Sequence, residues 1–193
     1  MKVIILGAGK VGESLARNLS EDNYDVSIVD LDKSKVDYLQ DRLDIASVLG
    51  HAAHPSSFKK SNADEDTIVL AVTNNDEVNI AACQIAKAQF SVKKTICRFK
   101  DSTYLDSLDS FGEGVIDIPI SPENEVTTHL KELIDHPGAE QIEEFADGKV
   151  NLVSVKVKKS GKLVDKALRT IEDDMPDVKS YIPSIYRKNK PFI

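Results

Sequence analysis

Short apolar runs alternate with stretches of spaced apolar residues over the first 120 positions of the chain. Continuous runs are typical of strands buried on both faces of a parallel sheet, and apolar residues recurring every three or four positions are typical of helices packed on one. The pattern predicts strands over residues 3–6, 26–29, 45–49, 67–72, 95–99 and 115–118. It predicts helices over residues 10–19, 34–42, 54 onward, 78–86 and 104–108. This alternation indicates an α/β fold with a Rossmann-like, doubly wound parallel sheet.

A helix start follows the sixth predicted strand. Ser121 suits the N-cap of a helix, Pro122 its first position and Glu123 its first turn. The apolar residues of this helix fall on one stripe, namely Val126, Leu130, Leu133 and Ile134. The triplet His-Pro-Gly at 136–138 then predicts its end.

The remaining sequence has a different character. Residues 150–157 alternate as a half-exposed strand does, and Ser160-Gly161 is typical of a turn. A short helix is predicted over 163–171, a strand over 181–186 and a turn at 188–190 that leads into 191–193. We therefore expect three parts: a nucleotide-binding domain at 1–120, a linking helix at 121–136, and a partial α+β C-terminal lobe at 137–193.

Composition narrows the class of protein. The 193 residues include 25 Lys and Arg against 32 Asp and Glu, a net charge of −7, which argues against nucleic acid as a partner. No apolar run reaches the ~18–20 residues that span a bilayer, and the N-terminal run is too short for a signal peptide. Cys83 and Cys97 form no C-x-x-C pair, and we expect two buried, reduced thiols in a cytoplasmic protein.

The strongest local motif is Gly7-Ala8-Gly9-Lys10-Val11-Gly12, which follows a predicted strand and opens a helix. In the dinucleotide fingerprint the first glycine allows the tight turn, the second lets the pyrophosphate approach, and the third lets the helix pack closely. Asp30 ends the second predicted strand, 18 residues after Gly12, near the offset at which an acid binds the ribose hydroxyls. That carboxylate would repel a 2′-phosphate, so the sequence favours NAD(H) over NADP(H).

Other chemistries lack their residues. A P-loop needs Lys and Ser or Thr after its last glycine, but Glu13 stands where that lysine should be. His51 and His54 have no third ligand at a spacing suited to zinc, so no metal site is expected, and loop histidines near a nucleotide are the favoured interpretation. We see no nucleophile elbow or other catalytic motif, and no catalytic residue is assigned.

Three further residues leave alternatives open. Thr73 and Asn74 end the fourth predicted strand, at the edge where ligands bind to doubly wound sheets. They could line the nucleotide cleft, or they could merely start the next helix, with Asn74 as N-cap and Glu77 completing a capping box. Arg98, late in an apolar strand, needs a partner. A nucleotide phosphate and a structural salt bridge are equally good candidates.

Taken together, several segments resemble RCK (regulator of potassium conductance) proteins. They are the glycine motif, Asp30, the segment 49–55 (LGHAAHP), the run 71–79 (AVTNNDEVN) and 120–123 (ISPE). The segments 145–150 and 184–187 are similar to the start of that family's C-terminal ligand-sensing lobe. Members of this type usually carry two tandem copies of the unit, whereas this chain has one whose C-terminal lobe stops early, as in an N-terminal fragment or a short variant.

The resemblance implies a cytoplasmic, non-enzymatic regulator docked on a potassium-translocating membrane subunit. It implies a homo-oligomer, a dimer or a larger ring, that binds NAD(H), or ATP and ADP, and changes shape. The family's binding positions correspond here to the turn Gly7, Ala8, Gly9, Lys10 and Val11, to Asp30, to Thr73 and Asn74, and to Arg98. The alternative is a small NAD-dependent oxidoreductase. Such an enzyme needs a substrate domain with a proton donor, for which the residues after 120 offer little room.

Overall fold

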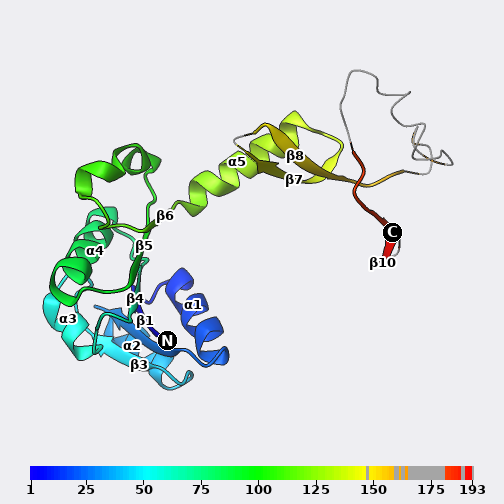
Figure 1. The fold of residues 1–193 in the computed structure, drawn as a ribbon. Coiled ribbons are helices and arrows are strands. Elements are labelled where there is room, and N and C mark those ends of the chain that lie inside the picture. The colour runs from blue at the N-terminus through cyan, green and yellow to red at the C-terminus, as the bar shows by residue number, and fades with distance from the viewer. Residues whose placement is uncertain (147, 159–160, 162–163, 165–180, 188–189, 193) are drawn as a thin grey trace. The chain divides into compact units, whose positions relative to one another are not determined.

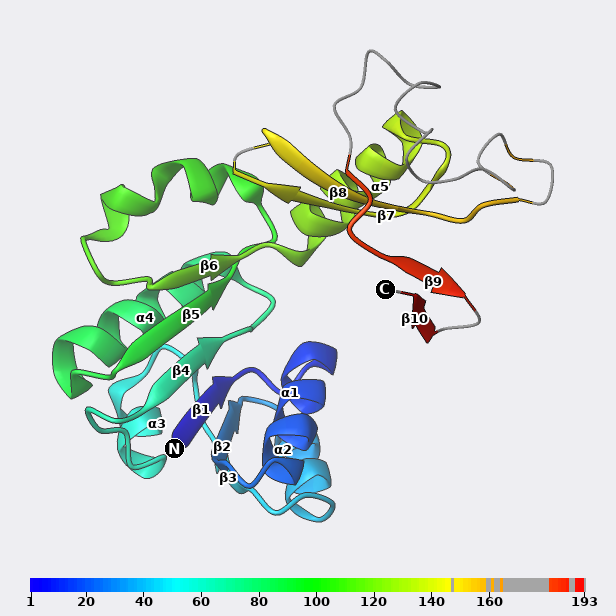
Figure 2. The same cartoon turned by 45° about the vertical axis from the view of Figure 1, so that its right-hand side comes forward.

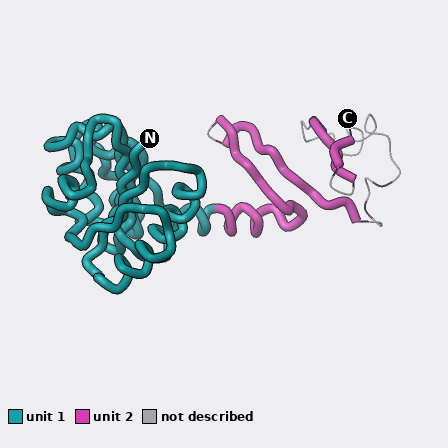
Figure 3. Tube along the Cα trace, turned by 90° about the horizontal axis from the view of Figure 1, so that it is seen from below, with its two compact units in different colours: residues 1–128 teal, residues 129–193 magenta. Residues whose placement is uncertain are grey.

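The computed structural model describes residues 1–146, 148–158, 161, 164, 181–187 and 190–192. Its contacts divide the chain into two compact units, residues 1–128 and 129–193 (Figure 3). The division falls within helix α5 (Pro122–Asp135). The three-part division at 120 and 136 stays a prediction.

The first unit holds a parallel sheet of six strands, which confirms the predicted fold class (Figure 1). The strands are β1 (Lys2–Leu6), β2 (Asp25–Asp30), β3 (Ala46–Leu49), β4 (Ile68–Ala71), β5 (Lys94–Arg98) and β6 (Ile118–Ile120). Their order is β3-β2-β1-β4-β5-β6, and every neighbouring pair is parallel. The order reverses direction between β1 and β4, so the loops after these two strands diverge and leave a crevice at their carboxyl ends.

Helices cover both faces of the sheet (Figure 2). They are α1 (Lys10–Glu21), α2 (Lys33–Gln40), α3 (Pro55–Lys60) and α4 (Asp76–Phe90). In β1, Val3 and Ile5 pack into one core with Ala16 of α1, whereas Ile4 and Leu6 pack into the other with Cys83 of α4. Because both faces of β1 are buried, its sequence is a continuous apolar run rather than an alternation.

The sixth strand was predicted wrongly. Residues 115–118 are apolar enough for a strand, yet Val115 and Ile116 pack from the preceding connection against the core that contains α4. The strand itself is Ile118–Ile120, with Pro119 opposite Cys97. Proline, which has no N–H to donate, is tolerated here because β6 is the edge of the sheet.

Two connections also differ from the prediction. In place of the α-helix predicted over 104–108, residues Ser102–Phe111 form a 3₁₀ segment with a kink at Ser107. Its serines and aspartates compete with the backbone for hydrogen bonds, which disfavours a regular α-helix. Helix α5 begins at Pro122 as predicted, but the buried Ser121 hydroxyl makes no hydrogen bond within the described structure.

The second unit contains two antiparallel pairs, β7 (Ala139–Phe145) with β8 (Val150–Val155), and β9 (Ile185–Arg187) with β10 (Lys190–Phe192). β8 confirms most of the strand predicted over 150–157, and β9 lies at the end of the one predicted over 181–186. β7 was not predicted. The helix expected over 163–171 lies outside the described residues except for Val164, as do Ser160 and residues 188–189 of the two predicted turns.

Both cysteines are buried and unbridged, as expected. The Cys83 thiol beside it and burial together raise the pKa of Cys97, so this thiol stays protonated. Among the described residues, no helix is long and apolar enough to cross a membrane.

The partly buried Asp117 carboxylate allows a test of how the stability of the fold depends on pH. Burial disfavours the Asp117 carboxylate, but hydrogen bonds from Lys87 at 2.7 Å and from the Thr95 amide at 2.7 Å outweigh it and lower the pKa of Asp117. The stability this group adds is present above the unfolded pKa of ~3.9 and is lost as pH falls through the lower, folded pKa.

We therefore expect Asp117→Asn to lower the free energy of unfolding by about 1 kcal/mol at pH 7. The difference from the parent should shrink as urea denaturation is repeated from pH 5 down to pH 3. Asp106→Asn, at an exposed side chain with no hydrogen bond or ion pair in the described structure, is the control. A difference that persists unchanged to pH 3 would contradict the assignment.

Candidate functional site

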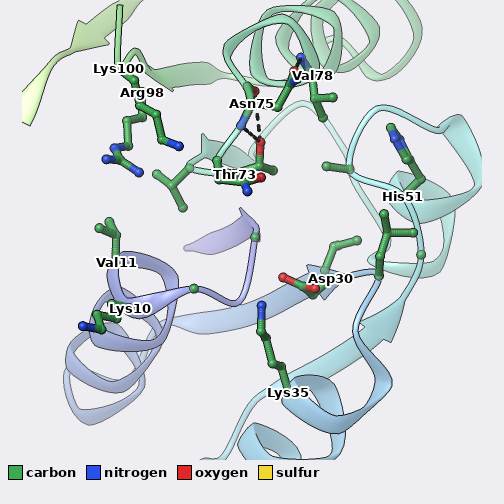
Figure 4. Close-up of a pocket in the computed structure, with 18 residues that line it drawn as sticks. Lys10, Val11, Asp30, Lys35, His51, Thr73, Asn75, Val78, Arg98 and Lys100 are labelled. Atoms are coloured by element: carbon green, nitrogen blue, oxygen red, sulfur yellow. Dashed lines mark hydrogen bonds between the residues drawn. The ribbon is translucent and has the colours of Figure 1, made fainter.

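A cleft of about 540 Å³ lies at the carboxyl ends of β1, β2, β4 and β5 (Figure 4). It is lined by eight of the ten residues predicted from the sequence: Gly7, Gly9, Lys10, Val11, Asp30, Thr73, Asn74 and Arg98. Ala8 and Gly12 do not line it. Their contribution is to the shape of the loop, as the following contacts show.

The loop after β1 packs so tightly that two glycines are required by the fold. At Gly12, an added Cβ would lie 1.9 Å from the Gly7 carbonyl oxygen. Gly7 itself has a φ of +108°, and a Cβ there would lie 3.0 Å from the Thr73 Cα of the next loop. Gly9 differs, because no described atom lies within 4 Å of the position its Cβ would take. The fold leaves that space open, on the side from which a ligand would approach.

Asp30 holds this loop in place. Its Oδ2 accepts a hydrogen bond of 2.6 Å from the Ala8 amide, and its Oδ1 accepts one of 2.8 Å from the Asp32 amide. A carboxylate has about four acceptor positions, so two remain for hydroxyl groups in the cleft. Asp30 is therefore placed to act both on the loop and on a ligand.

The N-terminus of α1 faces the same space. Gly9 is its N-cap and offers no side chain to bond the amides of the first turn. Those amides and the helix dipole suit an anion, and Lys10 and Val11 of this turn line the cleft.

The turn after β4 corrects one prediction. The N-cap of α4 is Asn75, not Asn74: the Asn75 Oδ1 accepts a 2.7 Å hydrogen bond from the Val78 amide. No capping box forms there, because Glu77 instead accepts from the Tyr104 hydroxyl at 2.9 Å. With the cap moved by one residue, Asn74 is exposed at the cleft.

Asn79, for which the sequence predicts no role of its own, connects the neighbouring strand ends. It is fully buried, and its Oδ1 accepts from the Thr73 amide at 3.0 Å and the Thr73 hydroxyl at 2.7 Å. Its Nδ2 donates to the Arg98 carbonyl at 3.0 Å. Asp76 adds a second tie, since its carboxylate accepts from the amides of Lys100 and Asp101. The ends of β4 and β5 are thus fixed to α4.

Arg98 is placed between the two alternatives left open by the sequence. It lines the cleft, and its Nη2 also lies 2.5 Å from the Oε1 of Glu123 on α5. A salt bridge is therefore present, on an arginine that could also reach a ligand.

The cleft is cationic although the chain is acidic. Four of its lining residues carry positive charge, namely Lys10, Lys35, Arg98 and Lys100. Among the lining residues that the structure describes, Asp30 has the only acidic side chain. Lys35 and Lys100 were missed by motif reasoning, since both follow strand ends in surface loops or helices without a pattern of their own. Also not predicted as site residues were Val29, Leu31, Gly50, Ala52, Val72, Asn75 and Val78. His51, interpreted from the sequence as a loop histidine near a nucleotide, does line the cleft, whereas His54 is not among the described lining residues.

The residues fit a nucleotide. There is free space beside Gly9, and the amides of the first turn of α1 have no side-chain cap. The Asp30 carboxylate has acceptor positions left for the hydroxyl groups of a ribose, and four cations line the cleft. Within the described ranges, no three His, Cys, Asp or Glu side chains are grouped as they would be to hold a metal ion.

Comparison with known proteins gives the family context. The family model "TrkA-N domain" matches residues 3–122. The Trk system potassium uptake protein TrkA of Halomonas elongata is 42% identical over 195 residues, covering 100% of this chain and 43% of the relative. The TrkA of Vibrio alginolyticus is 40% identical, covering 99% and 42%. The chain thus spans about two fifths of the length of these relatives.

Solved structures support the fold. The TrkA-N domain of the inner membrane protein ybaL from Escherichia coli has a TM-score of 0.58 at 19% identity, covering 69% of this chain and 96% of that one. The GsuK channel bound to NAD has a TM-score of 0.55 at 14% identity, covering 76% and 25%. The AMP-bound Kef C-terminal domain of Shewanella denitrificans has a TM-score of 0.55 at 18% identity, covering 70% and 82%.

The two kinds of glycine in the loop can be separated experimentally. Gly12→Ala should lower the free energy of unfolding by about 1–3 kcal/mol, because α1 must shift away from Gly7. Gly9→Ala should change it by less than about 0.5 kcal/mol, yet weaken binding of a phosphate-bearing ligand, tested with NADH, because the added methyl group fills the open space. Urea denaturation and fluorescence titration measure the two effects. Equal destabilisation by both substitutions would refute the distinction.

Proposed function

The chain belongs to the TrkA-N domain family, and from that membership we propose that it is a nucleotide-binding regulatory module of a Trk-type potassium uptake system. The cationic cleft at the switch point of the sheet is the observation that carries the proposal. A regulator of this kind binds a nucleotide and changes shape, and it catalyses no reaction.

NAD or NADH is the ligand we propose first, with ATP or ADP as the alternative. In this proposal the pyrophosphate meets Gly7–Gly12, including Ala8, Lys10 and Val11, while Asp30 binds the ribose hydroxyls. Thr73 and Asn74 line the cleft, and Arg98 reaches the phosphates. The bound nucleotide supplies negative charge and hydroxyl groups. The chain supplies amides, four cations and one carboxylate to match them.

The proposed partners are a membrane potassium-translocating subunit of the Trk type and a second copy of this chain. The names of the relatives support the first. For the second, Val126, Leu130 and Ile134 of α5 are 59%, 54% and 76% exposed, an apolar stripe without a covering partner in the described structure. The module would lie in the cytoplasm, held at the inner face of the membrane by its partner.

A nucleotide can act as a switch only if it binds two arrangements of the assembly with unequal affinity. Asn79 and Asp76 fix the strand ends around the cleft, so the parts left to respond are side chains such as Arg98 and the helix it holds. A coupling of ~1–3 kcal/mol would suffice to bias a transporter.

Asp30 provides a direct test of the ligand. Asp30→Ala should weaken NADH binding by ~1.5–3 kcal/mol, as expected for losing hydrogen bonds to a charged group. Asp32→Ala is the matched control, because Asp32 caps α2 through Ser34 and does not line the cleft. Calorimetric titration gives both affinities. Tighter binding of NADPH than of NADH by the parent would contradict the assignment.

The regulatory role is tested by placing spin labels on α5 and measuring distances between subunits. NADH and ATP should give different distance distributions, because they place different numbers of phosphates in the cleft. When NADH is mixed with a panel of carbonyl acceptors, no oxidation of NADH should be detected.

The substitutions Leu130→Asp and Leu133→Asp together should yield monomers and so remove the inter-subunit signal. Identical distributions for the apo, NADH and ATP forms would overturn the switch, and a robust oxidation rate would favour the oxidoreductase.

A further inference from the structure

We propose that Glu123 is a competing anion built into the chain: it occupies Arg98 when no phosphate is bound and so sets how strongly the cleft selects ligands by phosphate charge. The inference deepens the proposed nucleotide-binding function and rests on it. It assigns a specificity-determining role to a residue outside the cleft lining.

The first support is the position of Arg98. Its side chain is only 14% exposed, it lines the cleft, and its Nη2 is bonded to Glu123. Glu123 is 52% exposed and approaches from the first turn of α5. One guanidinium thus stands between a fixed internal carboxylate and the space proposed for phosphates.

The second support is the way Glu123 uses the guanidinium. The Nε–H and one Nη2–H of an arginine point the same way and together can hold an anion with two parallel hydrogen bonds. Glu123 bonds Nη2, while the buried Arg98 Nε has no hydrogen-bond partner among the described residues. A buried donor without an acceptor is costly, so the present pairing leaves this edge half satisfied. A phosphate oxygen pair could satisfy both donors.

The third support is that the exchange needs little else to move. The Arg98 carbonyl is held by Asn79 at 3.0 Å, and the strand pairs with β6 opposite Ile120. The backbone is therefore fixed, and the side chain alone can turn from one anion to the other. Glu123 stays ionised at neutral pH, because its own backbone amide and Arg98 lower its pKa, so the competitor is always present.

Two consequences follow. Ligands whose phosphates reach Arg98 must displace Glu123, and those with too little phosphate charge gain nothing from Arg98. Each displacement also frees the first turn of α5 from β5, which connects ligand charge to this helix. In this proposal a ligand gains affinity from Arg98 only if its phosphate charge is large enough to displace Glu123. This gain adds to the affinity provided by the glycine loop.

The experiment compares Glu123→Gln with Glu125→Gln by titration of ATP, ADP and adenosine in metal-free buffer. Both substitutions remove one negative charge from the same turn, but Glu125 has no ion pair in the described structure. Glu123→Gln should tighten ATP and ADP by about two- to tenfold, the range of one partly exposed ion pair, and leave adenosine unchanged. Glu125→Gln should leave all three within about twofold.

A second pair of variants isolates the arginine. With Arg98→Ala already present, adding Glu123→Gln should no longer change ATP affinity, since the competitor has nothing to hold. Thermal unfolding checks that each variant is folded.

Each other outcome overturns the inference. Equal tightening by both glutamine variants would mean a general charge effect, and weaker ATP binding by Glu123→Gln would mean that Glu123 positions Arg98 for the ligand. If the parent binds ATP and Glu123→Gln leaves the ATP affinity unchanged, the proposed competition is refuted, but the nucleotide-binding function is not. A folded parent that binds no nucleotide refutes the proposed function itself.

Discussion

The close approach of the loop after β1 to its surroundings is the constraint on which the rest of the site depends. Gly12 meets the Gly7 carbonyl where no Cβ fits, and Gly7 lies against the backbone of Thr73. The Asp30 carboxylate then fixes the loop through the Ala8 amide. Because these contacts join the ends of three neighbouring strands, the amides of α1 face the crevice in a fixed arrangement. An anion would therefore meet donors that are already oriented.

The opposite wall of the cleft is organised by buried side chains rather than by glycine. Asn79 satisfies both its oxygen and its nitrogen with groups of Thr73 and Arg98, which would otherwise be unpaired at two strand ends. Asp76 does the same for the two amides after Phe99. A buried polar network of this kind is stabilising only when it is complete. Its completeness leaves long side chains, not backbone, as the adjustable part of this wall.

The sequence predicts the parts of this protein that depend on local patterning. Buried runs such as 67–72 identify strands, and the glycine spacing with Asp30 identifies the cleft, because backbone geometry dictates those residue types. It fails where tertiary context decides. Ile116 is as apolar as a strand residue but packs from a loop. The N-cap of α4 is Asn75, whose side chain accepts a hydrogen bond from the Val78 amide. The strand β7 alternates poorly, with Ile142 its one buried apolar residue, so periodicity could not reveal it.

The charge of the cleft also could not be predicted from the sequence, because it depends on which residues the fold brings together. This distribution of charge makes it possible for an acidic chain to bind an acidic ligand. The net charge of −7 predicts repulsion of phosphates, yet four cations from separate elements converge on one cleft. Lys10, Lys35 and Lys100 are far apart in sequence, so no single window of the chain contains the whole cluster. A local cluster acts over about one Debye length, ~8–10 Å, whereas the distant acids are screened. In the proposed function the near groups therefore determine what enters, and Glu123, the acid paired with Arg98, would have more influence on the cleft than the net charge of the chain.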